Sequence, residues 1–177
     1  MELKYNGMAP KISPSAFVAP NTVITGDVTI SEQSSIWYGT IIRGDVSPVI
    51  IGSESNIQDL CCLHQSPDRP LIIEDRVTIG HRVTLHSCTV RSNALVGMDS
   101  TILDGAEIGE YAFIGAGSLV PPGKKIPPRT LAFGRPAKVI RELNDHDYSE
   151  LERIYRSYVD KGQRYKEAHT IKKFGTA

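Results

Sequence analysis

The sequence predicts an all-β fold, a parallel β-helix, followed by one C-terminal α-helix. The main observation is a register of nineteen aliphatic residues in the first two-thirds of the 177-residue chain. All but three of the eighteen steps between them are six residues long, and the exceptions run from 42 to 51, 63 to 73 and 85 to 90. A period of six fits neither a helix nor an alternating strand, and it is typical of a parallel β-helix. The register consists of Ile12, Val18, Ile24, Ile30, Ile36, Ile42, Ile51, Ile57, Leu63, Ile73, Ile79, Leu85, Val90, Val96, Ile102, Ile108, Ile114, Val120 and Ile126.

The residues between the aliphatic positions support this prediction. Four positions after each aliphatic residue the chain usually has a small residue, which permits the backbone to turn a corner. Glycine often follows the aliphatic residue directly, where the backbone bends or approaches another chain segment closely. A stack of such coils buries an apolar column that no single coil could bury. These glycines are Gly52, Gly80, Gly97, Gly109 and Gly115.

The chain is expected to divide into the β-helix, residues 1–140, and a C-terminal helix with its tail, residues 141–177, packed on the prism. Gly134 and Pro136 punctuate the last coil. An amphipathic helix is expected over roughly 145–168, with Asn144 or Asp145 as its N-cap, or with an alternative start at Ser149 and Glu152. The chain after Ala168 is expected to fray. The apolar side of the helix is formed by Leu151, Ile154, Tyr155, Tyr158 and Val159.

Composition excludes several classes of function. Twenty Lys and Arg residues balance twenty Asp and Glu residues, so no excess of positive charge favours nucleic acid or an anionic membrane as a partner. No stretch approaches eighteen apolar residues, and the first ten residues have no apolar core of signal-peptide length. Cys61, Cys62 and Cys88 form no C-x-x-C pair, which favours a reducing compartment and a cytoplasmic location.

The pattern resembles the left-handed β-helix of hexapeptide-repeat proteins, in which three hexads form one triangular coil. The handedness and the number of hexads per coil come from this resemblance. Nineteen rungs then give a little over six coils. Because hexads three apart lie on the same face, Arg43, His64 and His86 should form one column, spaced by about 4.8 Å per coil.

A second column is expected on the adjacent face. It contains Gln58, Asp59 and His81, with Asp59 directly below His81. The two stacked histidines of the first column can share a metal ion, which His81 of the same chain cannot readily reach. We therefore expect a ring of prisms, closed as a cyclic homotrimer, in which each site takes His64 and His86 from one chain and His81 from the next. Three imidazoles leave a fourth position open, as in catalytic metal sites.

Three sequence strings resemble the γ-class carbonic anhydrase family, in particular its short bacterial and archaeal members labelled ferripyochelin-binding-like. The strings are Arg43-Gly44-Asp45, Asn56-Ile57-Gln58-Asp59 with His64 five residues on, and Gly80-His81-Arg82-Val83-Thr84-Leu85-His86. The resemblance runs from Ile12 through the C-terminal helix.

This resemblance implies a role for each matched residue. The three histidines would bind zinc at a trimer interface, although ferrous iron and cobalt suit three imidazoles equally well. Arg43 would pair across the interface with Asp59, and Asp45 would be a second interface carboxylate. Gln58 would hydrogen-bond the metal-bound water or bicarbonate, and Tyr158, with Tyr155 as a weaker candidate, would be the helix tyrosine near the site.

The implied reaction is the reversible hydration of carbon dioxide to bicarbonate. The chain departs from the most active members of the family at Val46, where they carry a glutamate. Their acidic shuttle loop has no clear counterpart in residues 65–70, although Asp68 could substitute. We therefore expect an intact metal site with weak or conditional hydratase activity.

Two alternatives stay open at this stage. One is a coenzyme-A-dependent acyltransferase, because the closing segment 134–139 resembles that of hexapeptide acyltransferases. Those enzymes commonly rely on one catalytic histidine and a long extruded loop, whereas this chain has short loops and three clustered histidines. The other alternative is a metal-binding relative that is non-catalytic or acts as an acyl-CoA thioesterase.

Overall fold

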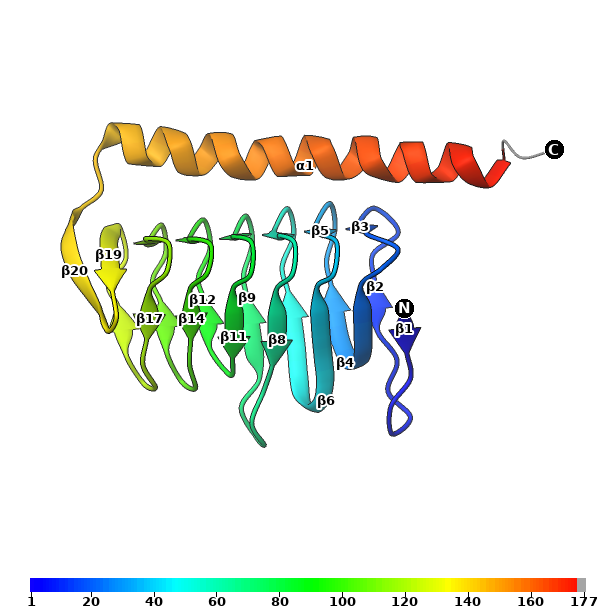
Figure 1. Cartoon of the computed structure of the whole chain (residues 1–177), viewed down its shortest axis with the longest axis horizontal. Helices are drawn as coiled ribbons and strands as arrows, with labels where there is room; N and C mark the ends of the chain where they lie inside the picture. The colour runs from blue at the N-terminus through cyan, green and yellow to red at the C-terminus, as the bar shows by residue number, and fades with distance from the viewer. Residues whose placement is uncertain (175–177) are drawn as a thin grey trace.

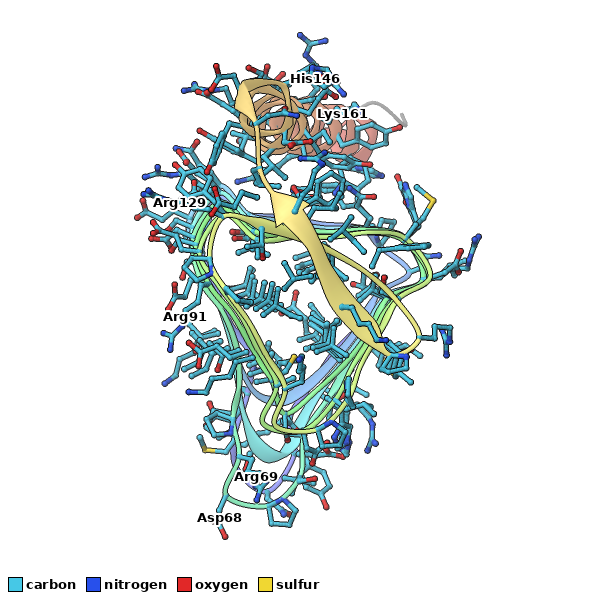
Figure 2. The ribbon with its side chains drawn as sticks, turned by 90° about the vertical axis from the view of Figure 1, so that its left-hand side faces the viewer. Asp68, Arg69, Arg91, Arg129, His146 and Lys161 are labelled. Carbon is cyan, nitrogen blue, oxygen red and sulfur yellow. The ribbon has the colours of Figure 1, made fainter. Side chains whose placement is uncertain are left out.

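The structure confirms the predicted fold class, a parallel β-helix of hexapeptide repeats with one C-terminal helix. It is a computed structural model that describes the backbone of residues 1–174 and the side chains of residues 1–169. About seven turns of parallel strands stack along one axis, and a single helix lies along one side of the stack (Figure 1). Viewed along that axis the coils have a triangular outline (Figure 2). We call the three sides the first, second and third face, in the order in which each coil visits them.

The first and second faces belong to one sheet, because two long strands run around the corner between them. These strands are β4 (Val23–Ile30) and β6 (Ile41–Ile51). The first face also contains β1 (Glu2–Leu3), β8 (Cys62–His64), β11 (Thr84–His86), β14 (Thr101–Ile102) and β17 (Leu119–Val120). The second face also contains β2 (Lys11–Ile12), β9 (Leu71–Ile73), β12 (Thr89–Val90), β15 (Glu107–Ile108) and β18 (Lys125–Ile126).

The third face is a separate sheet that ends in a hairpin. In the hairpin β20 (Ala137–Glu142) pairs antiparallel with β19 (Thr130–Gly134). The expected boundary at residue 140 therefore falls inside β20. The other strands of this face are β3 (Phe17–Val18), β5 (Ser35–Ile36), β7 (Asn56–Ile57), β10 (Thr78–Ile79), β13 (Leu95–Val96) and β16 (Phe113–Ile114).

The aliphatic register forms the core. All of its residues are buried except Ile12 and Val18 in the N-terminal coil, which are partly buried and pack against the others. Neighbouring coils place these residues in register, as in the stacking of Ile57, Ile79 and Val96. Each layer covers the apolar side chains of the next, and this burial is the main stabilising contribution of a solenoid.

Three columns of residues with positive φ mark the three corners, because a residue in the left-handed backbone conformation lets the coil turn sharply. Between the first and second faces they are Gly26, Asp68, Ser87, Gly105 and Gly123. Between the second and third faces they are Gln33, Glu54, Arg76, Asn93, Tyr111 and Arg129. Between the third face and the next coil's first face they are Gly39, Leu60, Arg82, Asp99 and Gly117.

All three breaks in the six-residue register lie at the corner between the first and second faces. The strand β6 carries extra residues around this corner, and the segment 65–70 forms a loop whose tip, Asp68 and Arg69, projects away from the prism (Figure 2). The third break is one residue short and is turned by Ser87, which has a φ of 42°. The irregular corner is the one beside His64 and His86.

The helix α1 (Asp145–Phe174) covers the third face and contacts β3, β5, β7 and β10. Asn144 caps it, since its side-chain oxygen accepts a hydrogen bond from the Asp147 backbone N–H at 3.1 Å. In return, the Asp147 carboxylate accepts one from the Asn144 backbone N–H at 2.8 Å. The helix continues to Phe174, past the expected end near residue 168, and the expected fraying of the tail remains a prediction. No helix in the described part of the chain is long and apolar enough to cross a membrane.

Candidate metal centre

His64 and His86 stack at the end of the first face, as the repeat predicted. The strands β8 and β11 pair in parallel with these two residues in register. The imidazole rings lie 5.2 Å apart between centroids, and His64 Nδ1 is 3.2 Å from His86 Nε2. Arg43 precedes them in the same column, because Ile42 stacks on Leu63.

Each of these two histidines contacts a carboxylate through its other ring nitrogen. Asp45 Oδ1 lies 3.0 Å from His64 Nε2, and Asp104 Oδ1 lies 2.6 Å from His86 Nδ1. When each carboxylate accepts an N–H, the nitrogens with free lone pairs are His64 Nδ1 and His86 Nε2, which face each other. Histidines that bind metals usually donate their second nitrogen in this way.

The spacing of the two free nitrogens fits a shared metal ion. Two imidazole nitrogens bound to one tetrahedral ion at about 2.0–2.1 Å lie roughly 3.3–3.4 Å apart. The observed separation between His64 Nδ1 and His86 Nε2 is 3.2 Å. The donor set and its spacing therefore suit an ion that accepts imidazole, such as zinc, cobalt or ferrous iron.

His81 lies at the opposite edge of the first face, directly above Asp59. Its Nδ1 is 2.9 Å from Asp59 Oδ2, so the third histidine also has a carboxylate partner and a free Nε2. Gly80, which precedes it, permits a close approach of the coils, because a Cβ there would lie 2.6 Å from the backbone nitrogen of Met98. Within one chain, and among the described residues, no three His, Cys, Asp or Glu side chains are placed to hold an ion together.

Arg43 contacts the site within its own chain. Its guanidinium Nη1 lies 2.5 Å from Asp45 Oδ2, because two residues separated by one position share a side of the strand. The Arg43 side chain is 48% exposed. The expected pairing of Arg43 with Asp59 of another copy remains a prediction.

Gln58 lies on the third face beneath the helix. Its side chain is buried, and its Nε2 donates to Asn56 Oδ1 at 3.1 Å, while Asn56 Nδ2 donates to Thr78 Oγ1 at 2.9 Å. This ladder fixes the Gln58 amide and leaves its Oε1 and one N–H for a further partner.

The helix places its two candidate tyrosines differently. The Tyr158 ring packs edge-on against Trp37 at 5.4 Å, and burial, together with the negative charge of Asp59, raises the pKa of its phenol. Tyr155 instead lines a groove with Arg76 and Arg129 at a different corner. Of the two tyrosines, Tyr158 is therefore the one on the side of Asp59 and His81.

Sequence reasoning missed Asp104 and Ser66. Ser66 Oγ donates to Asp104 Oδ2 at 2.6 Å, and this bond, followed by the contact with His86, lowers the pKa of the Asp104 carboxyl. The register could have located Asp104, because it lies two residues after Ile102, which stacks on Leu85 next to His86. No periodic signal marks Ser66, which lies in the loop 65–70.

Val46, which stands where the most active family members carry a glutamate, and Asp68, the candidate proton shuttle, both lie at the surface. Val46 follows Asp45 and is 47% exposed, so an apolar side chain occupies this position beside the site. Asp68 lies at the outer tip of the loop (Figure 2), and no hydrogen bond or ion pair connects its carboxylate to the described side chains. The acid groups closest to the histidines are those of Asp45, Asp59 and Asp104.

Comparison with known proteins identifies the family. Residues 87–122 match the model of the bacterial transferase hexapeptide family, which consists of six repeats. The chain is 67% identical to a carbonic anhydrase of Geobacillus kaustophilus over 92% of this chain and 89% of that protein. It is 38% identical to a mitochondrial γ carbonic anhydrase of Arabidopsis thaliana over 88% of this chain and 58% of that protein.

A solved structure shares both sequence and fold with the chain. It is a Bacillus cereus protein provisionally described as an acetyltransferase, with 63% identity and a TM-score of 0.94 over 94% of this chain and 97% of that one. The two carbonic anhydrases and the acetyltransferase description name different activities on one fold, and a fold does not by itself decide the activity. The repeat, the three histidines with their carboxylates and the extended similarity to the named carbonic anhydrases place this chain in the γ-class carbonic anhydrase family of hexapeptide-repeat proteins.

Proposed function

We propose that this protein is a metal-dependent γ-class carbonic anhydrase that interconverts carbon dioxide and bicarbonate at sites shared between copies of the chain. The observation that carries the proposal is the pairing of each histidine with one carboxylate. Asp45, Asp59 and Asp104 fix His64, His81 and His86 in turn, and each ring keeps one nitrogen free. Such pairs orient metal ligands and set their tautomers.

The positions of the two half-sites support a cyclic trimer. His81 lies at one edge of the first face, and His64 with His86 lies at the other, so one copy can complete the half-site of the next. Contacts of this head-to-tail kind close into rings. The first face and its edge near His81 also expose apolar side chains, including Ile41, Leu60 and Met98. Exposed apolar residues grouped in this way are typical of protein–protein contacts.

The metal ion, expected to be zinc, would be held by His64 Nδ1 and His86 Nε2 of one copy together with His81 Nε2 of a second copy. When bound, such an ion lowers the pKa of a coordinated water and so supplies hydroxide near neutral pH. Each carboxylate would accept the N–H of one ring nitrogen and so leave the other nitrogen as the lone-pair donor, and Asp45 in turn contacts the Arg43 guanidinium. The proposal includes a cytoplasmic location, because the three cysteines form no C-x-x-C pair and so favour a reducing compartment.

Gln58 and Tyr158 would contact the small substrate. The Gln58 amide is held by Asn56, so its remaining polar atoms need no reorganisation when bicarbonate binds. The Tyr158 phenol is protonated at neutral pH, since its pKa is raised further above the ordinary value of about 10, so it can donate a hydrogen bond to an anion. Both groups therefore position a planar oxyanion beside the histidines.

Proton export would limit turnover. Val46 cannot accept a proton, and Asp68 lies at the outer end of its loop. We therefore expect the rate of hydration to rise with the concentration of an imidazole-type buffer until a chemical step limits it.

The proposal is tested by metal analysis combined with a hydration assay. Purified protein loaded with zinc, cobalt or, anaerobically, ferrous iron should contain about one ion per chain and should hydrate carbon dioxide in a stopped-flow assay. A trimer of normal mass that binds no ion and shows no hydration with any of the three metals would contradict the proposal.

A second candidate, acyl transfer from coenzyme A, is favoured by the likeness to the Bacillus cereus structure. The His86–Asp104 pair would also suit a general base. The two functions separate experimentally, because acyl transfer by His86 should survive complete removal of metal by a chelator, whereas carbon dioxide hydration should not.

A further inference from the structure

A groove lies where α1 rests against the corner between the second and third faces. It encloses about 540 Å³. A second hollow of about 490 Å³ continues it along the helix and shares Arg76, Tyr155 and Arg156 with the first. Pockets of several hundred cubic ångströms are of the size that binds small ligands. The first hollow is lined by Arg76, Asn93, Tyr111, Arg129, Tyr148, Leu151, Glu152, Tyr155 and Arg156.

The prism side of the groove is built from the corner residues of four consecutive coils, Arg76, Asn93, Tyr111 and Arg129. All four have positive φ values, between 55° and 61°. Side chains with a Cβ are strained in this region, and glycine is the usual solution. The other two corners use glycine in several coils, whereas no glycine occurs in the positive-φ column of this corner. The chain thus keeps large side chains here at a cost in backbone energy, which is typical of functional positions.

The charge of the first hollow is positive. Three arginines line it against one carboxylate, Glu152, which is bound to Arg156 at 2.7 Å. Arg76 is bound to Glu54 at 3.2 Å. The Arg129 guanidinium makes no ion pair or hydrogen bond with any side chain in the described part of the protein, and it projects at the corner below the helix (Figure 2). It is therefore available to an anion.

Aromatic rings line the same hollow. Tyr111 and Tyr148 pack edge-to-face on its wall, with their ring centroids 5.6 Å apart and their planes at 70°. The Arg156 guanidinium lies 5.6 Å from the Tyr155 ring. Tyrosine rings and stacked guanidinium groups provide flat surfaces for a planar ligand, and the Asn93 amide, which also lines the hollow, can bond to its polar edge.

We propose that this groove binds a small phosphate-bearing molecule with a planar ring, of nucleotide size. Arg129 binds the phosphate, because a guanidinium donates two parallel N–H groups to phosphate oxygens. The ring lies against Tyr111 and Tyr155, two of the groove's aromatic surfaces. Arg76 and Arg129 are three coils apart, which corresponds to about 14 Å at the spacing of neighbouring strands. A mononucleotide can span this distance when the two long arginine side chains reach inward.

This site is separate from the metal centre. The groove lies at the corner opposite the first face, so a ring of copies formed through the first face leaves it open on the outside. None of its lining residues contacts His64, His81 or His86 in the hydrogen bonds and ion pairs described above. The inference therefore goes beyond the proposed function and does not depend on it.

Calorimetric titration of the full-length protein tests the proposal, with AMP, adenosine and inorganic phosphate as separate probes. AMP should bind with a dissociation constant of about 1 mM or below, and adenosine and phosphate should each bind at least about tenfold more weakly. Arg129→Gln should weaken AMP binding by about tenfold or more. Arg153→Gln is the matched control, because Arg153 lies on the exposed side of the same helix and pairs with Glu150.

Each outcome decides the proposal. Unchanged melting temperatures for both variants, with AMP binding weakened only by Arg129→Gln, support it. Should Arg129→Gln fail to fold, Arg129→Lys takes its place, and AMP binding should again weaken because lysine keeps the charge but cannot donate two parallel N–H groups. No heat from AMP at millimolar concentrations, equal affinity in the variant and the wild type, or phosphate binding as tightly as AMP would overturn it.

Discussion

Replacement of Asp104 by alanine should weaken metal binding without unfolding the β-helix. The Asp104 carboxylate accepts from His86 Nδ1 at 2.6 Å, a short hydrogen bond to a charged acceptor. Without it the His86 ring can rotate, and its proton can move to the nitrogen that should bind the ion. Loss of such a partner typically lowers metal affinity by 10–100-fold, or about 1.4–2.8 kcal/mol. Asp104 is 28% exposed, so water replaces part of the interaction and we expect the lower half of this range.

Ser66→Ala provides a graded comparison. Ser66 Oγ donates to the second Asp104 oxygen at 2.6 Å, so its removal leaves the bond to His86 intact. The expected loss is about 1 kcal/mol or less, roughly a fivefold decrease in affinity. Glu107→Ala is the matched control, because Glu107 lies in the same coil as Asp104 but pairs with Arg91.

The assay is competition with a chromophoric chelator for zinc, followed by the visible spectrum of the cobalt-loaded protein. Asp104→Ala should lower the zinc affinity by about tenfold or more and change the cobalt spectrum, and Glu107→Ala should do neither. Zinc affinity within twofold of the wild type in a folded Asp104→Ala protein would refute the assignment of Asp104 as the residue that positions His86.

Three further predictions concern the site and the fold. His81→Ala should abolish stoichiometric metal binding while the circular dichroism spectrum stays unchanged, and full metal occupancy would refute the sharing of the site. Leu85→Ala opens a cavity at a fully buried core position and should cost about 2–5 kcal/mol in the free energy of unfolding measured with urea. Asp147→Asn should lower the free energy of unfolding by about 1 kcal/mol at neutral pH, because the hydrogen bond from Arg141 depresses the pKa of this helix-capping carboxyl. A depressed pKa stabilises the fold above the unfolded pKa of about 4, and this stabilisation is lost as the pH falls through the folded value. The difference in unfolding free energy between the wild type and Asp147→Asn should therefore vanish in acid. A difference that stays constant with pH would show that the charge of Asp147 is not its cause.

The sequence located most of the site because the repeat converts residue number into position. The alignment of His64 with His86 and of Asp59 with His81 follows from counting hexads, and both pairs are found in the structure. Asp104 escaped because it carries no motif and lies in the coil after His86. Ser66 could not be found by counting, since the loop 65–70 interrupts the register.

Other features depended on information that a periodic pattern does not contain. The helix runs to Phe174 rather than ending near residue 168. The separation of Tyr158 from Tyr155 depends on how the helix is rotated on the third face, which the packing of Tyr158 on Trp37 determines. The expected sharing of one metal ion between His81 and a second copy of the chain remains a prediction, because contacts within one chain do not test it.

Mixing two inactive variants tests the shared site most directly. His81→Ala and His86→Ala chains each lack one ligand, so neither homotrimer should bind metal at the shared site. Equal amounts of the two variants are unfolded together and reassembled. A site is then complete where a His81→Ala chain supplies His64 and His86 and the neighbouring His86→Ala chain supplies His81. Random assembly gives such interfaces in about a quarter of positions. The account predicts recovery of about a quarter of the wild-type zinc content and hydratase activity. Recovery of neither in correctly assembled mixed trimers would contradict it.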